Sequence, residues 1–136
     1  MPQLERSEVA ALRIRMKTLG LIVAEVDLDL RYVWIDNPHP DFDAFAVIGK
    51  RDDQLIPEAE AGDIKAIKQE VIRRADSISR VLVFDRSDGK HYYSISAHPV
   101  LNTQGAVEGV FTVGFEVAHE GRAFDSGTLG PTAPVR

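Results

Sequence analysis

The chain has 136 residues, which is enough for one domain with a real hydrophobic core but too short for two. Its formal net charge of -5 disfavours nucleic acid or an anionic membrane as the main partner, because both require a dense basic surface. No apolar stretch approaches the roughly 20 residues that span a bilayer, and a chain without cysteine has neither disulfides nor thiol chemistry. We therefore expect a cytoplasmic domain without a nucleic-acid partner or a membrane-inserted segment.

The N-terminal segment, residues 1–20, is expected to form an amphipathic connector helix over about residues 4–19, ending near Gly20. Four apolar residues follow a 3-4-3 spacing, which places them on one narrow seam: Val9, Leu12, Met16 and Leu19. Two heptads are too few for a stable coiled coil alone. The helix therefore either packs on its own domain or provides a homodimer interface through these four side chains.

Residues 21 to 40 have the pattern of a β-hairpin. The runs 21–26 and 32–35 are rich in β-branched and aromatic side chains, and polar residues separate them. The segment 36–40 ends the second strand, because proline cannot donate a ladder hydrogen bond and restricts the residue before it.

A longer helix is predicted over residues 58–75, after an irregular segment at 41–57. Acidic residues lie at its start and basic residues at its end, an arrangement that suits the helix dipole. One stripe of this helix is apolar and its basic residues are expected on the other faces. The stripe comprises Ile64, Ile67, Val71 and Ile72, and the basic residues are Lys65, Lys68, Arg73 and Arg74.

Three strands are predicted after this helix, at residues 79–85, 91–100 and 107–117, with turn residues between them. Strands that follow one another through tight turns form an antiparallel sheet, so the fold class is α+β. Residues 21–117 form the domain. The remaining segment, 118–136, has little apolar periodicity and is expected to be a flexible C-terminal tail.

Three short segments resemble PAS domains, in the order that this family has them. Residues 27–38, DLDLRYVWIDNP, resemble the opening hairpin of PAS sensors attached to bacterial histidine kinases. Residues 47–57, VIGKRDDQLIP, resemble the hydrophobic-Gly-Lys-x-Asp segment of these sensors. There the glycine, here Gly49, permits a turn into a short helix that the aspartate, here Asp52, caps. Residues 105–110, GAVEGV, resemble the last hairpin of the same group.

The resemblance implies a PAS fold, in which helices pack on one face of a five-stranded antiparallel sheet, here with a flanking N-terminal helix. It also implies a sensory or signal-relay role in a two-component system, with a kinase or another output module as a partner and no catalytic activity. Phe115–Ala118 stands where such domains often carry an Asp-Ile-Thr ending, and no kinase sequence follows. We therefore expect either a free-standing sensor or a piece of a larger protein.

The cofactor is not identified by the sequence, but two family cofactors fit it poorly. Light-sensing relatives use a reactive cysteine, so a cysteinyl-flavin adduct is impossible in this chain. Haem-binding relatives usually place histidine on the long helix, where this chain has none. His39 lies in a proline-rich turn, either solvated or at a pocket mouth, and an odd offset places His91 and His98 on opposite faces of one strand. We therefore predict neither a haem site nor a metal site.

A noncovalent ligand pocket between the sheet and the helices is the remaining candidate site. Its predicted lining supplies apolar walls with a few polar anchors: Trp34, Asn37, Phe45, Ile48, Leu55, Ile67, Val83, Tyr93, Ile95 and Phe111. The alternative is that these side chains pack together and leave no cavity, which fits a ligand-free dimerisation adaptor. A third hypothesis is a cone-shaped α+β isomerase or hydrolase, which requires a buried acid with a raised pKa.

The outer face of the sheet is a second candidate surface. The runs 80–84 and 110–115 are apolar on both alternations, so both faces are expected to be covered. Either the N-terminal helix covers the outer face within one chain, or two chains pair there.

Overall fold

The computed structural model describes residues 6–117. In chain order its elements are α1 (Arg6–Thr18), β1 (Ile22–Asp27), β2 (Tyr32–Asp36), the 3-10 turn η1 (Asp52–Gln54), α2 (Glu58–Arg74), β3 (Ile78–Arg86), β4 (Gly89–Leu101) and β5 (Val107–Val117). This order confirms the predicted one, and each helix and strand begins and ends within two residues of its prediction. The predicted tail, 118–136, lies outside the described residues.

The five strands form one antiparallel sheet in the order β2-β1-β5-β4-β3. Three of the four pairings join strands that are consecutive in sequence. The fourth joins β1 to β5, which are the first and last strands in the sequence. The pairing of β1 with β2 shifts register between Glu25 and Val26, which bends the first hairpin. The sheet therefore brings the first and last strands together at its centre.

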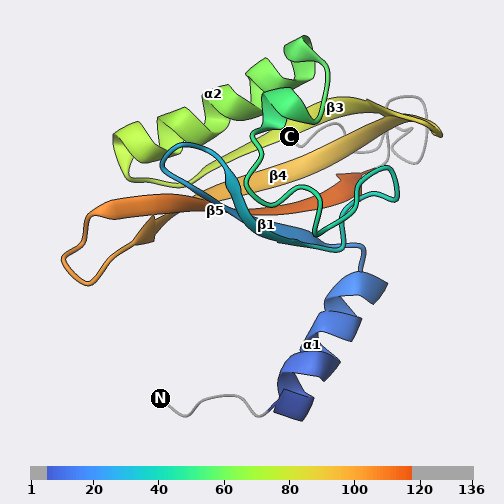
Figure 1. Ribbon diagram of the computed structural model, residues 1–136, viewed down its shortest axis with the longest axis horizontal. Helices are drawn as coiled ribbons and strands as arrows, with labels where there is room; N and C mark the ends of the chain where they lie inside the picture. Colours follow the sequence, from blue (N-terminus) through green and yellow to red (C-terminus); the bar gives the residue numbers. More distant parts are fainter. Residues whose placement is uncertain (1–5, 118–136) are drawn as a thin grey trace, which may run out of the picture.

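Helix α2 lies over one face of the sheet, together with the loop that joins β2 to α2 (Figure 1). Its buried residues recur at helical spacing and face the strands: Ala61, Ile64, Ile67, Lys68 and Val71. The expectation that Lys68 points to solvent is wrong, because position 68 lies one turn from both Ile64 and Val71 and so falls on the buried stripe.

The hydrophobic core occupies the space between α2 and the inner face of the sheet, in two clusters. One cluster contains Val26, Leu30, Ile67, Val71, Ile78, Ala97 and Val110. The other contains Ile64, Phe84, Tyr93 and Ile95. Inner-face positions alternate along each strand, which is the period expected of a half-buried strand.

Helix α1 extends away from the sheet instead of covering it (Figure 1). It ends at Thr18, and Gly20, with a φ of 74°, turns the chain toward β1. The side chain of Arg13 holds α1 to β2 by donating two hydrogen bonds to the Asp36 carboxylate, at 3.1 and 3.0 Å. No helix within residues 6–117 is long and apolar enough to cross a membrane.

The outer face of the sheet carries exposed apolar side chains, including Val81, Val83 and Phe115. Of the two alternatives for this face, covering by α1 of the same chain is wrong, because α1 contacts the body of the domain near Asp36 and leaves its own Val9 and Leu12 exposed. Among residues 6–117, no segment covers either apolar surface.

Candidate functional site

A cavity of about 120 Å³ lies between the inner face of the sheet, η1, α2 and the loop after β2. Most of its wall is apolar, with a few polar and charged groups. The lining residues are Ile22, Ala24, Tyr32, Ile35, Pro38, His39, Phe42, Val47, Asp52, Leu55, Ile56, Ile64, Lys68, Phe84, Arg86, Tyr93, Ile95, Thr112 and Gly114. Apolar walls with a few convergent polar groups are typical of small-molecule sites.

Lys68, Asp52 and Tyr32 form a buried polar cluster in this wall. The Lys68 ammonium donates to Asp52 Oδ2 at 2.6 Å and to the Tyr32 hydroxyl at 3.2 Å, and that hydroxyl donates to Asp52 Oδ1 at 2.7 Å. Lys68 is 1% exposed and Asp52 is 7% exposed. Burial lowers the pKa of Lys68, although the Asp52 charge opposes that shift. Burial and the neighbouring Asp52 raise the pKa of Tyr32 well above its usual value.

The prediction that this aspartate caps the short helix is wrong. Asp52 is the first residue inside η1, so the N-cap position belongs to Arg51. The backbone N–H of Arg51 donates to the side chain of Gln54. The Asp52 carboxylate points into the core, where it neutralises Lys68. Both of its oxygens accept hydrogen bonds, one from the Tyr32 hydroxyl and one from the Lys68 ammonium.

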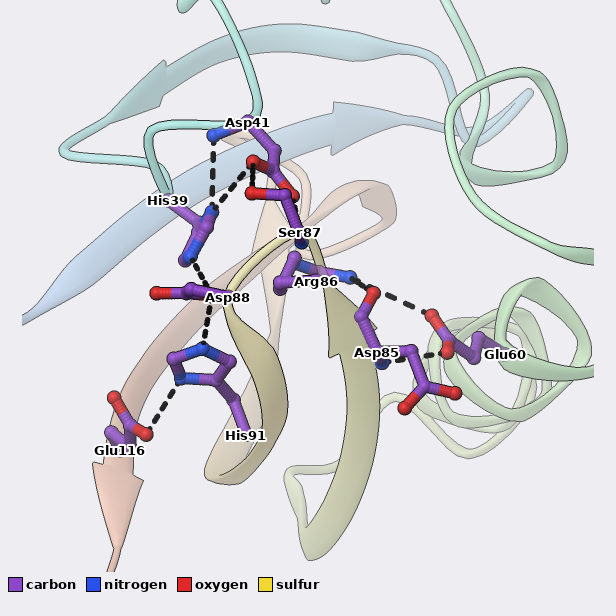
Figure 2. Close-up of polar contacts among 9 residues, drawn as sticks. All are labelled: His39, Asp41, Glu60, Asp85, Arg86, Ser87, Asp88, His91 and Glu116. Atoms are coloured by element: carbon purple, nitrogen blue, oxygen red, sulfur yellow. Dashed lines mark hydrogen bonds and ion pairs between the residues drawn. The ribbon is translucent and has the colours of Figure 1, made fainter.

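Arg86 supplies a second cation to the cavity. Its guanidinium lies between two aromatic rings, 4.9 Å from the centroid of Phe42 and 4.8 Å from that of Phe84. Its side chain is 10% exposed, and Nη1 lies 3.6 Å from Glu60 Oε1 (Figure 2). Arg86 Nε is buried without a hydrogen-bond partner among residues 6–117. This donor is buried in the packing beside the cavity, and its missing partner is unexplained by the residues described.

A network of histidines and carboxylates joins the loop after β2 to the β3–β4 turn beside the cavity (Figure 2). The Nε2 atoms of His39 and His91 lie 3.0 and 2.7 Å from the same oxygen of Asp88. The second ring nitrogen of His91 lies 2.7 Å from Glu116 Oε2. Hydrogen bonds to Asp88 and to Glu116 raise the pKa of His91 above its usual value. The solvated alternative for His39 is wrong, since its side chain is only 8% exposed.

Three of the ten predicted pocket residues line this cavity: Leu55, Tyr93 and Ile95. The other seven lie elsewhere. Trp34, Phe111 and Val83 are on the outer side of the sheet, Phe45 and Ile48 are exposed in the loop, Ile67 is in the core, and Asn37 donates to the carbonyl of Leu21.

Strand register explains why the large aromatic residues were placed on the wrong face. Trp34 and Phe111 both pair with Glu25, one from β2 and one from β5, so all three side chains share the outer face. The Trp34 indole N–H donates to Glu25 at 3.2 Å, and its ring lies 6.0 Å from that of Phe111. Phe45, by contrast, is 85% exposed. Aromatic size was therefore a misleading signal for burial in this chain.

Sequence reasoning missed the polar groups of the cavity. Lys68 was detectable from its helical spacing, because it falls between the apolar positions 64 and 71. Arg86 lies two residues after Phe84, so both side chains are on the inner side of β3. Strand periodicity indicates this placement once the inner face of β3 is known. The meeting of His39 with His91 had no local signal, since these residues are far apart in sequence and meet only through the fold.

The four residues predicted for a dimer interface lie on α1 or just after it. Val9, Leu12 and Leu19 are exposed, and Met16 is half-buried. Together with the open outer face of the sheet, they remain a predicted interface.

Comparisons with known proteins identify the domain. Residues 17–121 match the family model described as PAS fold. The chain is 25% identical over 118 residues to Histidine kinase 5 of Arabidopsis thaliana, of which it covers 13%. Its structure resembles the sensory box of a sensor histidine kinase from Vibrio cholerae, with a TM-score of 0.62, 18% identity and coverage of 83% of this chain and 94% of that one.

A third similar structure corrects the expectation about partners. VqmA from Vibrio cholerae, solved as a complex with ligand and DNA, has a TM-score of 0.71 and 20% identity, covering 84% of this chain and 51% of VqmA. The exclusion of a nucleic-acid partner is therefore wrong, because a domain of this fold occurs in a DNA-binding receptor and the chain spans only about half of that receptor. The charge of an isolated domain does not report the partners of a whole protein. With the family match, the five-stranded sheet and the covering helix in agreement, this chain belongs to the PAS-fold family.

Proposed function

We propose that this PAS domain senses a small molecule bound in the cavity beneath α2 and relays its presence to an attached output module. The observation that carries this proposal is the cavity of about 120 Å³, in which an aromatic and aliphatic wall surrounds Lys68 and Arg86. Charged side chains are seldom buried, and each of these two cations has a carboxylate partner.

Cavity size and chemistry define the class of ligand. An apolar cavity of about 150 Å³ holds a single benzene ring, so a space of about 120 Å³ fits a compound of similar or smaller size. Arg86 and Lys68 both line the cavity, so a compound with a hydrogen-bond acceptor suits its charge. We therefore propose a small planar compound that carries an oxygen or nitrogen acceptor and packs against the apolar wall of the cavity.

The segment from Asp36 to His39 offers a path from the cavity to α1. Pro38 and His39 line the cavity. Asn37 donates from Nδ2 to the carbonyl of Leu21 at 2.9 Å, and Asp36 binds Arg13 on α1. A ligand that displaces His39 therefore acts on the segment that attaches α1 to the sheet. If the ligand binds more tightly to one of two positions of α1, it shifts the population toward that position.

A chemical-shift screen tests the proposal. Amide resonances of the uniformly ¹⁵N-labelled full chain are recorded with small heteroaromatic and carboxylate compounds. Shifts that saturate and concentrate on cavity residues support the ligand role. The Asn37→Ala variant tests the relay, since binding should persist while the accompanying shifts in α1 are lost.

The interaction-module alternative is favoured by one observation, the exposed apolar side chains of α1 and of the outer sheet face. A second copy of the chain is the occupant that this surface suits. Sedimentation of the full chain and of a Leu12→Glu variant tests it. A dimer that dissociates in the variant supports this role, and a monomer in both removes it.

The output module stays a proposal, as do a cytoplasmic location and the absence of catalysis. The proposal of an output module is supported by the 25% identity with part of a histidine kinase and by the family match.

A further inference from the structure

Two histidines and a carboxylate converge at the edge of the domain, outside the polar cluster of the cavity. His39 comes from the loop after β2, Asp88 from the β3–β4 turn and His91 from β4 (Figure 2). One ligand atom of each lies within 4.8 Å of the other two. The shared Asp88 oxygen lies 3.0 Å from Nε2 of His39 and 2.7 Å from Nε2 of His91. Three elements that are separate in sequence thus present nitrogen and oxygen ligands to one point.

These ligand types and spacings suit a divalent transition metal. Zinc takes imidazole nitrogen and carboxylate oxygen at about 2.0–2.2 Å in tetrahedral geometry. Ligand atoms around such an ion are therefore a little over 3 Å apart, between the shortest contacts and the 4.8 Å limit seen here. Asp88 is 60% exposed in a turn, so it can move outward by the small distance that a metal requires.

Both histidines have a carboxylate near the second ring nitrogen, as metal-binding histidines commonly do. His91 Nδ1 lies 2.7 Å from Glu116 Oε2. His39 Nδ1 lies 3.7 Å from Asp41 Oδ1 and accepts a hydrogen bond from the Asp41 backbone N–H. Metal at His39 Nε2 requires the tautomer with hydrogen on Nδ1, so the hydrogen bond from the Asp41 backbone N–H must break and the Asp41 carboxylate must approach to accept from Nδ1. The Ser87 backbone N–H and hydroxyl already hold that carboxylate in place.

Charge also favours a cation at this point. Three carboxylates surround the two imidazoles: Asp41, Asp88 and Glu116. A divalent ion neutralises two of these charges at once, whereas protonation of one histidine neutralises one. We propose that His39, Asp88 and His91 bind a divalent transition metal of the zinc class. Because His39 also lines the cavity, the metal fastens the loop after β2 to the β3–β4 turn at the cavity edge.

Calorimetric titration with Zn²⁺ tests this site on the full chain, purified without a histidine tag and stripped with a chelator. We expect one Zn²⁺ per chain. The His39→Gln, Asp88→Asn and His91→Gln variants should each weaken binding by about tenfold or more, and Glu116→Gln by about 10- to 100-fold. His98→Gln is the matched control, because His98 lies on the other face of β4 and contacts Ser77 and Ser96.

Co²⁺ provides an independent readout, since its visible spectrum reports tetrahedral nitrogen and oxygen ligation. Circular dichroism identifies variants that remain folded, and Asp88→Asn in an exposed turn is the change least expected to disturb the fold. No binding of Zn²⁺ to the wild-type chain overturns the proposal. Equal affinity in a folded Asp88→Asn variant, or an equal loss in His98→Gln, overturns it as well.

Discussion

The ammonium of Lys68 on α2 lies 2.6 Å from a carboxylate oxygen of Asp52 in η1, and both side chains are buried beside the cavity. This ion pair joins the long helix to the short turn that precedes it. A buried pair contributes little net stability over an apolar substitute, but breaking it leaves an uncompensated charge in the core. Its value here is the fixed position that it gives to the polar wall of the cavity.

Replacing Lys68 by methionine should lower the free energy of unfolding by about 3–5 kcal/mol, because Asp52 would remain buried without its cation. Urea denaturation at neutral pH measures the effect. The double variant Lys68→Met with Asp52→Asn should be more stable than Lys68→Met alone, since it removes both charges. If the double variant is no more stable than the single one, Asp52 carries no uncompensated charge and our account of the pair is wrong.

Two glycines of β5 should respond in opposite ways to alanine. A Cβ atom on Gly109 would lie 2.5 Å from the backbone oxygen of Val26, so the β1–β5 pairing must move, at a cost of about 1–3 kcal/mol. A Cβ on Gly114 would meet Ile95 Cγ1 at 3.6 Å, an ordinary contact. Gly114→Ala should therefore be neutral or slightly stabilising. Thermal unfolding of both variants compares them, and equal stability would contradict the close approach at Gly109.

Most of the fold was predictable from the sequence because its signals are local. The change from helical to alternating periodicity marks α1 and β1, and turn residues separate the last three strands. The tight turns then require antiparallel neighbours. What local patterns do not specify is the pairing of β1 with β5, which joins the two ends of the domain. The resemblance to the PAS family predicted five antiparallel strands, and the order of those strands comes from the structure.

The candidate site was less predictable, because it depends on which face each strand buries. Trp34 and Phe111 were predicted to line the pocket, but their shared pairing with Glu25 places them on the outer face. The charged groups of the cavity were missed for the opposite reason, since charged side chains are almost always solvated. Lys68 is an exception that requires a partner, and that partner is distant in sequence.

The attachment of α1 predicts a pH dependence centred on Asp36. Hydrogen bonds from Arg13 lower the pKa of Asp36 below its usual value, and partial burial opposes this shift. The folded state therefore favours the carboxylate, so the contribution to stability is present above the ordinary aspartate pKa and is lost as pH falls through the lowered value. Carbonyl-detected NMR titration should place the pKa of Asp36 below about 3.9.

The Arg13→Gln variant is the control for this titration, because it removes the charge and keeps a polar side chain. The pKa of Asp36 should rise toward its usual value in the variant. The loss of unfolding free energy should be small, about 0–1 kcal/mol at neutral pH, and should vanish once the pH falls below the lowered pKa of Asp36. An unchanged pKa of Asp36 in Arg13→Gln would show that α1 is not held at β2 by this pair.

The central claim, that the cavity beneath α2 binds a small molecule, is tested most directly by comparing the wild-type chain with Gly114→Leu in the ¹⁵N chemical-shift screen. The leucine side chain introduced at position 114 would project from β5 into the cavity, next to Ile95. We predict that a small planar compound with an acceptor atom shifts cavity resonances of the wild-type chain, and that a folded Gly114→Leu variant shows none of these shifts. Identical shifts in both proteins, or no saturable binding to the wild-type chain, would contradict the claim.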